Sequence, residues 1–70
     1  MKNVTKGNIP SEIKQNAEWY HTQGFEARKK GEFKLAIDLY TKAIEIMPSH
    51  FKAHFNRGFA LDKVIKKIRI

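Results

Sequence analysis

Apolar and small residues recur at helical spacing in three stretches of the chain. They are Ile13, Ala17, Tyr20, Gly24 and Ala27 in the first stretch, Phe33, Ala36, Ile37, Tyr40, Ala43, Ile44 and Met47 in the second, and Phe51, Phe55, Gly58, Phe59, Leu61, Ile65 and Ile68 in the third. Steps of three and four residues place side chains on one side of a helix. The pattern therefore predicts an all-α protein of three helices, and strand signals are few.

Helix-terminating residues separate the three stretches. Pro10 and Ser11 predict the first helix start, with Ser11 as the N-cap. The sequence RKKGE predicts its end, because Gly31 can adopt the left-handed conformation that follows many helices. Pro48 ends the second helix, and Ser49 is expected to cap the third.

An internal repeat relates the first and third stretches. A shift of 34 residues places Gly24 on Gly58, Phe25 on Phe59 and Lys29 on Lys63. A period of that length, with two helices and a closing proline, is typical of helical repeats. The spacing A-x3-Y-x2-A-x4-P over residues 36–48, with a glycine upstream, resembles the tetratricopeptide repeat (TPR) family.

The resemblance implies an antiparallel, TPR-like helix-turn-helix followed by a third, capping-like helix. The residues that match structural positions of the repeat are Tyr20, Gly24, Ala27, Ala36, Tyr40, Ala43, Pro48 and Gly58. Small residues such as Gly24 and Ala43 are expected to let two helices approach closely, with Tyr40 filling the groove beside them. Gln23 and Ala27 depart from the family pattern, which has larger apolar residues there.

The expected organisation is one and a half repeats. Residues 1–9 are predicted to be a flexible leader and residues 10–70 a helical domain. That domain has one full repeat at 17–50, a partial second repeat at 51–63 and a basic helical tail at 64–70. The turn glycine of the second repeat would fall on Ile65, so its second helix is missing. Such units usually stack in arrays of about three or more, so we expect a fragment or truncated form of a larger protein, or a chain that completes itself by pairing.

The family resemblance also implies a binding groove lined by the first helix of each repeat. On this sequence the lining is Glu18, His21, Phe25, Arg28 and Lys29, followed by Lys52, Phe55, Asn56, Phe59 and Lys63. Basic residues beside phenylalanines predict a protein or peptide partner, acidic and with an apolar anchor. The phenylalanines can instead pack between helices. A chaperone-type carboxylate clamp is not expected, because only Asn56 matches that pattern.

The end of the third helix carries a second apolar strip. Leu61, Ile65 and Ile68 lie at steps of four and three residues, with Val64 beside them. Two interpretations remain open. The strip packs back on the second helix as a cap, or it associates with a second copy of the chain.

Charge and composition narrow the class of protein. The net charge is +7, there is no cysteine, and no apolar run reaches the length of a membrane span or a signal peptide. We therefore expect an intracellular, cytoplasmic protein without a membrane partner. Binding of nucleic acid or another anionic surface through the basic face and tail is the alternative. Nucleic acid is the less favoured partner, because Glu18, Glu26 and Asp62 interrupt the basic residues.

The sequence offers little for catalysis. Its serines and threonines have no base placed with them in a motif, and paired carboxylates are not apparent. His50 and His54 are four residues apart and can face together on a helix, but no third ligand follows at matching spacing. We therefore predict a non-enzymatic interaction module with no metal and no cofactor.

Overall fold

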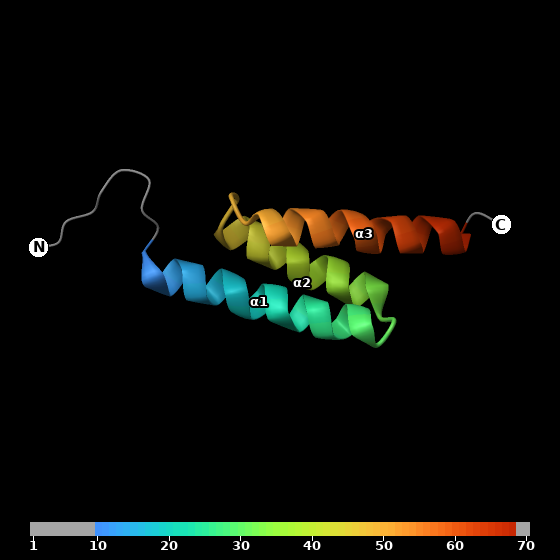
Figure 1. Ribbon diagram of the computed structural model, residues 1–70, viewed down its shortest axis with the longest axis horizontal. Coiled ribbons are helices and arrows are strands. Elements are labelled where there is room, and N and C mark those ends of the chain that lie inside the picture. The colour runs from blue at the N-terminus through green and yellow to red at the C-terminus, as the bar shows by residue number, and fades with distance from the viewer. Residues whose placement is uncertain (1–9, 69–70) are drawn as a thin grey trace, which may run out of the picture.

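The computed structural model describes residues 10–68 of the chain, with side chains up to residue 67. Three helices follow one another: α1 (Ser11–Lys29), α2 (Phe33–Ile46) and α3 (Phe51–Ile68). Neighbouring helices run antiparallel, and α2 lies between α1 and α3 (Figure 1). The described chain contains no strand, so the predicted all-α, TPR-like fold is confirmed. The predicted leader, residues 1–9, and the last two residues of the tail lie outside the described residues.

The turn between α1 and α2 has the conformation that the sequence predicts. Gly31 has a φ of +81°, in the left-handed region. The Gly31 amide donates a hydrogen bond to the Arg28 carbonyl (2.9 Å), and the Glu32 amide donates one to the Ala27 carbonyl (2.9 Å). These bonds satisfy carbonyls at the end of α1 that would otherwise lack partners. The chain can therefore reverse within a few residues, and α2 packs against α1.

Both helix starts differ from the prediction. Ser11 is the first residue of α1 and Pro10 is its N-cap, so Ser11 does not cap the helix. Proline has no amide hydrogen to donate, so it suits the end of a helix where amides lack partners. The N-cap is therefore Pro10, one residue before the predicted Ser11. The cap of α3 is His50, whose ring Nδ1 accepts the Ala53 amide at 3.1 Å, and not Ser49. The ring nitrogen of His50, three residues before Ala53, accepts the same amide hydrogen that a serine hydroxyl at this position would accept.

Alanines from all three helices surround one large side chain in the core. Tyr40 is the largest fully buried side chain. The alanines buried with it are Ala27, Ala36, Ala43, Ala53 and Ala60, and Ala17 is buried nearer the start of α1. Small side chains let helix axes approach one another. Burial of Ala36 and Ala43 follows the prediction, whereas Ile13 from the predicted first stripe is 39% exposed.

Gly24 makes room for a ring rather than for a helix backbone. A Cβ at Gly24 would lie 2.7 Å from two carbon atoms of the Tyr40 ring. Gly58, its equivalent in the partial second repeat, has no atom within 4 Å of such a position. The repeat therefore places two glycines alike in sequence, but only the first is covered.

The third helix covers α2, as a capping-like helix should, but with different residues from those expected. Ala53 and Ala60 are buried and Val64 is half-buried. Leu61 and Ile65 are 41% and 48% exposed, so of the two interpretations left open these residues do not fit packing back on α2. The side of α3 that faces α2 carries the small residues Ala53 and Ala60, whereas the outer side carries the larger Leu61 and Ile65. Residue type alone therefore pointed to the outer side as the buried one.

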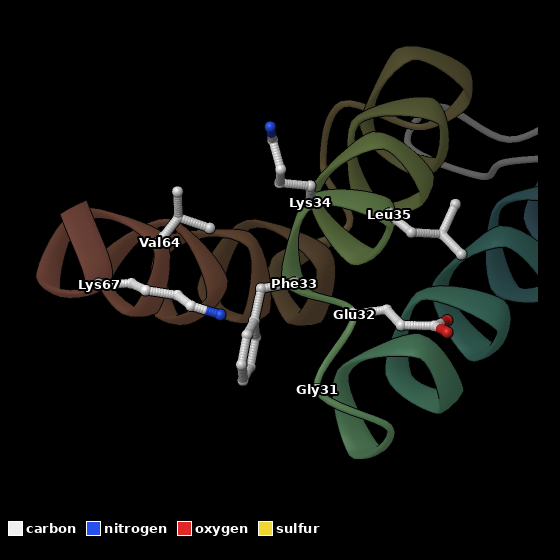
Figure 2. Close-up of a pocket in the computed structure, with 7 residues that line it drawn as sticks. All are labelled: Gly31, Glu32, Phe33, Lys34, Leu35, Val64 and Lys67. Carbon is white, nitrogen blue, oxygen red and sulfur yellow. The ribbon is translucent and has the colours of Figure 1, made fainter.

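An open pocket of about 440 Å³ lies where the end of α3 passes the start of α2. Figure 2 shows Val64 and Lys67 of α3 on one side and Phe33 of α2 on the other. The complete lining is Gly31, Glu32, Phe33, Lys34, Leu35, Val64 and Lys67. Sequence periodicity did not predict this pocket, because it forms where two helices diverge.

Candidate functional site

The predicted groove is a surface shared by α1 and α3. The structure brings five of its residues into direct contact around Arg28, as described below, and links two more by a hydrogen bond. In that bond the Asn56 side-chain amide lies 3.0 Å from Nε2 of His21, which joins α3 to α1 directly. Phe55 and Lys52 are exposed and make no such link. The part of the groove with fixed geometry is therefore its α1 side and the middle of α3.

Arg28 and its neighbours form a continuous row of rings and cations. The Arg28 guanidinium carbon lies 4.7 Å from the centre of the Phe25 ring and 4.9 Å from that of Phe59. Lys29 Nζ lies 5.5 Å from the Phe25 ring centre, and Lys63 Nζ lies 5.2 Å from that of Phe59. Each contact of this kind contributes about 0.5–1 kcal/mol at an exposed site. We call these five residues the Arg28 row.

The central cation of the Arg28 row retains unused hydrogen-bonding capacity. Arg28 is half-buried, and its Nε is buried without a hydrogen-bond partner. Among the described residues no carboxylate pairs with the Arg28 guanidinium. By contrast, Nζ of Lys29 lies 3.5 Å from Oε2 of Glu26 in an exposed ion pair. An arginine held between two rings presents its remaining donors in a fixed plane, which suits a carboxylate.

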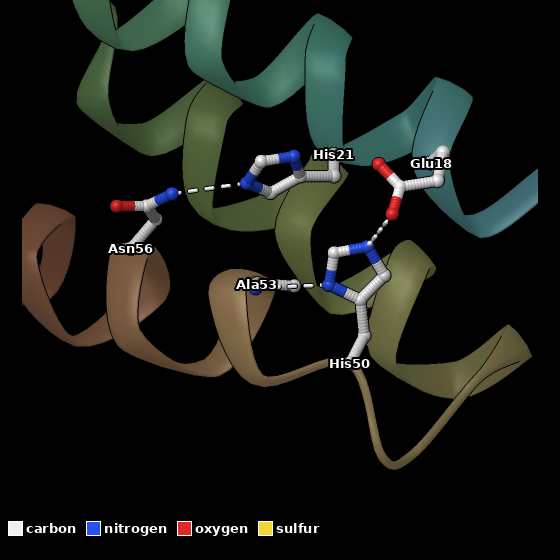
Figure 3. Close-up of polar contacts among 5 residues, drawn as sticks. All are labelled: Glu18, His21, His50, Ala53 and Asn56. Atoms are coloured by element: carbon white, nitrogen blue, oxygen red, sulfur yellow. Dashed lines mark hydrogen bonds and ion pairs between the residues drawn. The ribbon is translucent and has the colours of Figure 1, made fainter.

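A polar cluster lies further along α1, towards its N-terminal end. Figure 3 shows Glu18 and His21 of α1 facing His50, the residue before α3. His50 is only 3% exposed, and its Nε2 lies 3.2 Å from Oε2 of Glu18, without the geometry of a hydrogen bond. The rings of His21 and His50 are 5.0 Å apart, and the His21 ring is 5.6 Å from that of Tyr40. The cluster thus joins both outer helices to the core.

Burial and charge act on two titratable groups here. Burial lowers the pKa of His21, and the nearby His50 and Lys52 lower it further, while Glu18 acts in the opposite direction. Burial raises the pKa of Tyr40, and the Arg28 guanidinium partly offsets that rise. Both burial and the nearby positive groups therefore favour the neutral form of the His21 ring.

The two histidines at a spacing of four residues have different neighbours in the structure. His54 Nε2 lies 2.8 Å from the Pro48 carbonyl, on the turn, while His50 faces Glu18. The pair at a spacing of four residues does not face together, because His50 precedes the helix that His54 occupies. Only the return of α3 along α1 brings His50 to Glu18 and His21, and no signal along the chain marks that contact.

No helix among residues 10–68 combines the length and the apolar character that crossing a bilayer requires.

Comparison with known proteins places the fold in a family. A family model described as TPR repeat matches residues 24–64, which is more than half of the chain. A TPR repeat-containing protein of Borreliella burgdorferi is 32% identical over 69 residues, covering 99% of this chain and 29% of that protein. An uncharacterized protein of Methanocaldococcus jannaschii is 38% identical over 47 residues, covering 67% of this chain and 55% of that protein. The chain therefore spans between about a third and about half of the length of these relatives, and no solved structure matches it significantly. With its small–large–small pattern around Tyr40 and the turn at Gly31, the chain belongs to the tetratricopeptide repeat family.

Proposed function

We propose that this chain is a protein-interaction module whose α1–α3 groove binds an acidic peptide. Proteins of the TPR family serve as scaffolds for protein–protein contacts. The observation that carries the proposal is the Arg28 row, in which one cation stands between two rings and no described carboxylate neutralises it. The peptide would place a carboxylate on Arg28 and an apolar side chain beside the exposed ring of Phe55.

The contacts of the Arg28 row form within the chain itself, without a ligand. The rings of Phe25 and Phe59 restrict the guanidinium from both helices. Less side-chain entropy is then lost on binding than for a free arginine, which increases affinity. Lys29 and Lys63 extend the positive potential along the groove, and the net charge of +7 attracts anions from a distance.

Charge reversal in the groove tests the proposal. The double variant Arg28→Glu, Lys29→Glu is expected to lose most of its affinity for a labelled acidic peptide that contains phenylalanine, mainly through a slower association rate. Fluorescence anisotropy and stopped-flow mixing at low salt measure the affinity and the rate. Raising the ionic strength should weaken binding to the unmodified chain.

A matched control carries the same change in charge on another surface. Lys34 and Lys42 are exposed residues of α2, so Lys34→Glu, Lys42→Glu changes the net charge equally and leaves the groove intact. Equal loss of affinity in both double variants would mean that total charge, rather than the groove, attracts the peptide. Unchanged binding of the groove variant at low salt would show that the groove assignment is wrong. Circular dichroism confirms that each variant remains helical.

Single-stranded RNA of equal charge distinguishes the alternative function. The exposed carboxylates of Glu18, Glu26 and Asp62 lie among the basic residues of α1 and α3 and repel a phosphate backbone. We expect the RNA to bind more weakly than the peptide. Tighter binding of RNA, with a steep dependence on salt, would favour an anionic-surface binder instead.

Self-association through α3 is a second candidate function, favoured by the exposure of Leu61 and Ile65. The face that holds them also contains Gly58, which nothing covers. This candidate predicts a concentration-dependent dimer in sedimentation, with the helices antiparallel so that the tail lysines lie apart. Leu61→Lys, Ile65→Lys should remove it, whereas Leu35→Lys, at an equally exposed site on α2, should not. A monomer at every concentration in the unmodified chain would exclude this candidate.

A further inference from the structure

Glu18, His21 and His50 bring three ligand-type atoms together from two separate parts of the chain. One nitrogen or oxygen of each lies within 4.8 Å of the other two. Glu18 and His21 are one helical turn apart on α1, and His50 approaches from the turn before α3 (Figure 3). Oε2 of Glu18 and Nε2 of His50 are 3.2 Å apart, a separation at which both atoms can touch one metal ion.

A buried ring nitrogen with an imperfect partner points into this cluster. Only 3% of His50 is exposed, and its Nε2 lies 3.2 Å from Oε2 of Glu18 without the geometry of a hydrogen bond. Buried polar atoms nearly always form a good hydrogen bond, so this contact leaves room for a better partner. A cation between His50 and Glu18 would satisfy this atom and neutralise the carboxylate at the same time.

We propose that Glu18, His21 and His50 form a site for a divalent transition-metal ion, with Zn²⁺ as the best-fitting ion. Two imidazoles and one carboxylate are a known zinc ligand set, and they leave a fourth position for water or a ligand. Glu18 is exposed, which gives the ion an entry path from solvent. The site shares Glu18 and His21 with the predicted lining of the groove, but it uses no residue of the Arg28 row.

The surroundings supply both support and competition for the ion. The Asn56 side chain lies 3.0 Å from Nε2 of His21, and with its amide rotated its oxygen accepts the ring N–H, which frees Nδ1 for the ion. Lys52 opposes binding through its positive charge.

The α3 cap also competes with the ion. Nδ1 of His50 accepts the Ala53 amide, so the neutral ring carries its proton on Nε2. When the ion occupies Nε2, the remaining proton of the ring moves to Nδ1 and displaces the Ala53 amide. We therefore expect modest affinity, and we expect zinc to accelerate hydrogen exchange at the amide of Ala53.

Zinc titration of the full chain without an affinity tag tests the site. Calorimetry should find one Zn²⁺ per chain, and zinc at about tenfold excess over its dissociation constant should raise the unfolding midpoint. Cobalt in place of zinc should give the visible absorption of a four-coordinate site. Glu18→Gln and His21→Gln should each weaken binding about tenfold or more, whereas His54→Ala, whose ring faces the turn, should bind as the unmodified chain does.

The variants avoid the risk of unfolding. Glu18→Gln keeps the shape of an exposed side chain and leaves the His50 cap intact, so loss of zinc binding in it reports on the site itself. Absence of binding heat and of cobalt absorption in the unmodified chain would overturn the proposal. So would zinc binding that survives in both Glu18→Gln and His21→Gln, or that disappears in His54→Ala.

Discussion

Tyr40→Ala is expected to leave most of the chain unfolded. Among the described residues Tyr40 is the only large side chain that is fully buried, and it belongs to one core cluster with buried alanines from all three helices. Truncating a buried aromatic side chain costs about 3–5 kcal/mol, because the neighbours cannot close the cavity. The cores of domains this small rarely supply more than about 3–5 kcal/mol in total. Removing one ring therefore takes away most or all of the free energy of unfolding.

Urea denaturation followed by circular dichroism measures this effect, and Tyr40→Phe is its control. The phenylalanine variant keeps the ring and removes only the hydroxyl, which lies near the Arg28 guanidinium without a well-formed hydrogen bond. Its free energy of unfolding should stay within about 1 kcal/mol of the original value. If Tyr40→Ala unfolds at the same urea concentration as the unmodified chain, Tyr40 is not the centre of the core.

Gly24→Ala is expected to destabilise the chain by about 1–3 kcal/mol, because the added methyl group overpacks the contact between α1 and α2. Its Cβ would lie 2.7 Å from Cδ1 and Cε1 of Tyr40, a distance that forces the ring or the helix to move. The ring itself is fully buried and has little room to rotate. The loss exceeds the gain of about 1 kcal/mol that alanine normally brings to the interior of a helix.

Gly58→Ala is the matched control, and its effect should have the opposite sign. Gly58 lies 34 residues after Gly24, inside α3, and a Cβ there would meet nothing within 4 Å. Only the helix-propensity gain remains, so the variant should be more stable by up to about 1 kcal/mol. Destabilisation by Gly58→Ala would mean that another surface covers this face in solution, as the self-association candidate predicts.

Local chemistry explains why much of the fold was predictable. The three helices, the turn at Gly31 and the alanine-rich interface of α2 each depend on residues within a few positions of one another. Backbone preferences and helical periodicity act over that range, so they can be read directly. Residues of the groove were predicted because the repeat resemblance assigns one side of α1 and α3 to it. Their peptide-binding role remains a proposal.

Contacts between α1 and α3 were not predictable in the same way. Periodicity shows which residues of a helix share a side, but it does not show which other helix, if any, covers that side. The Arg28 guanidinium stands between Phe25 and Phe59 only because α2 holds the two outer helices at the required separation.

The sequence by itself determined the three helices, their breaks and the small residues that let them pack, because these features arise from local conformational preference. Tertiary structure alone decided that the space beside Gly24 is occupied and the space beside Gly58 is empty, since the difference depends on whether a ring such as that of Tyr40 lies opposite. It also decided that His50 caps α3 and meets Glu18 and His21. Those residues are about thirty positions apart, and only packing of the helices through α2 brings them within reach of one another.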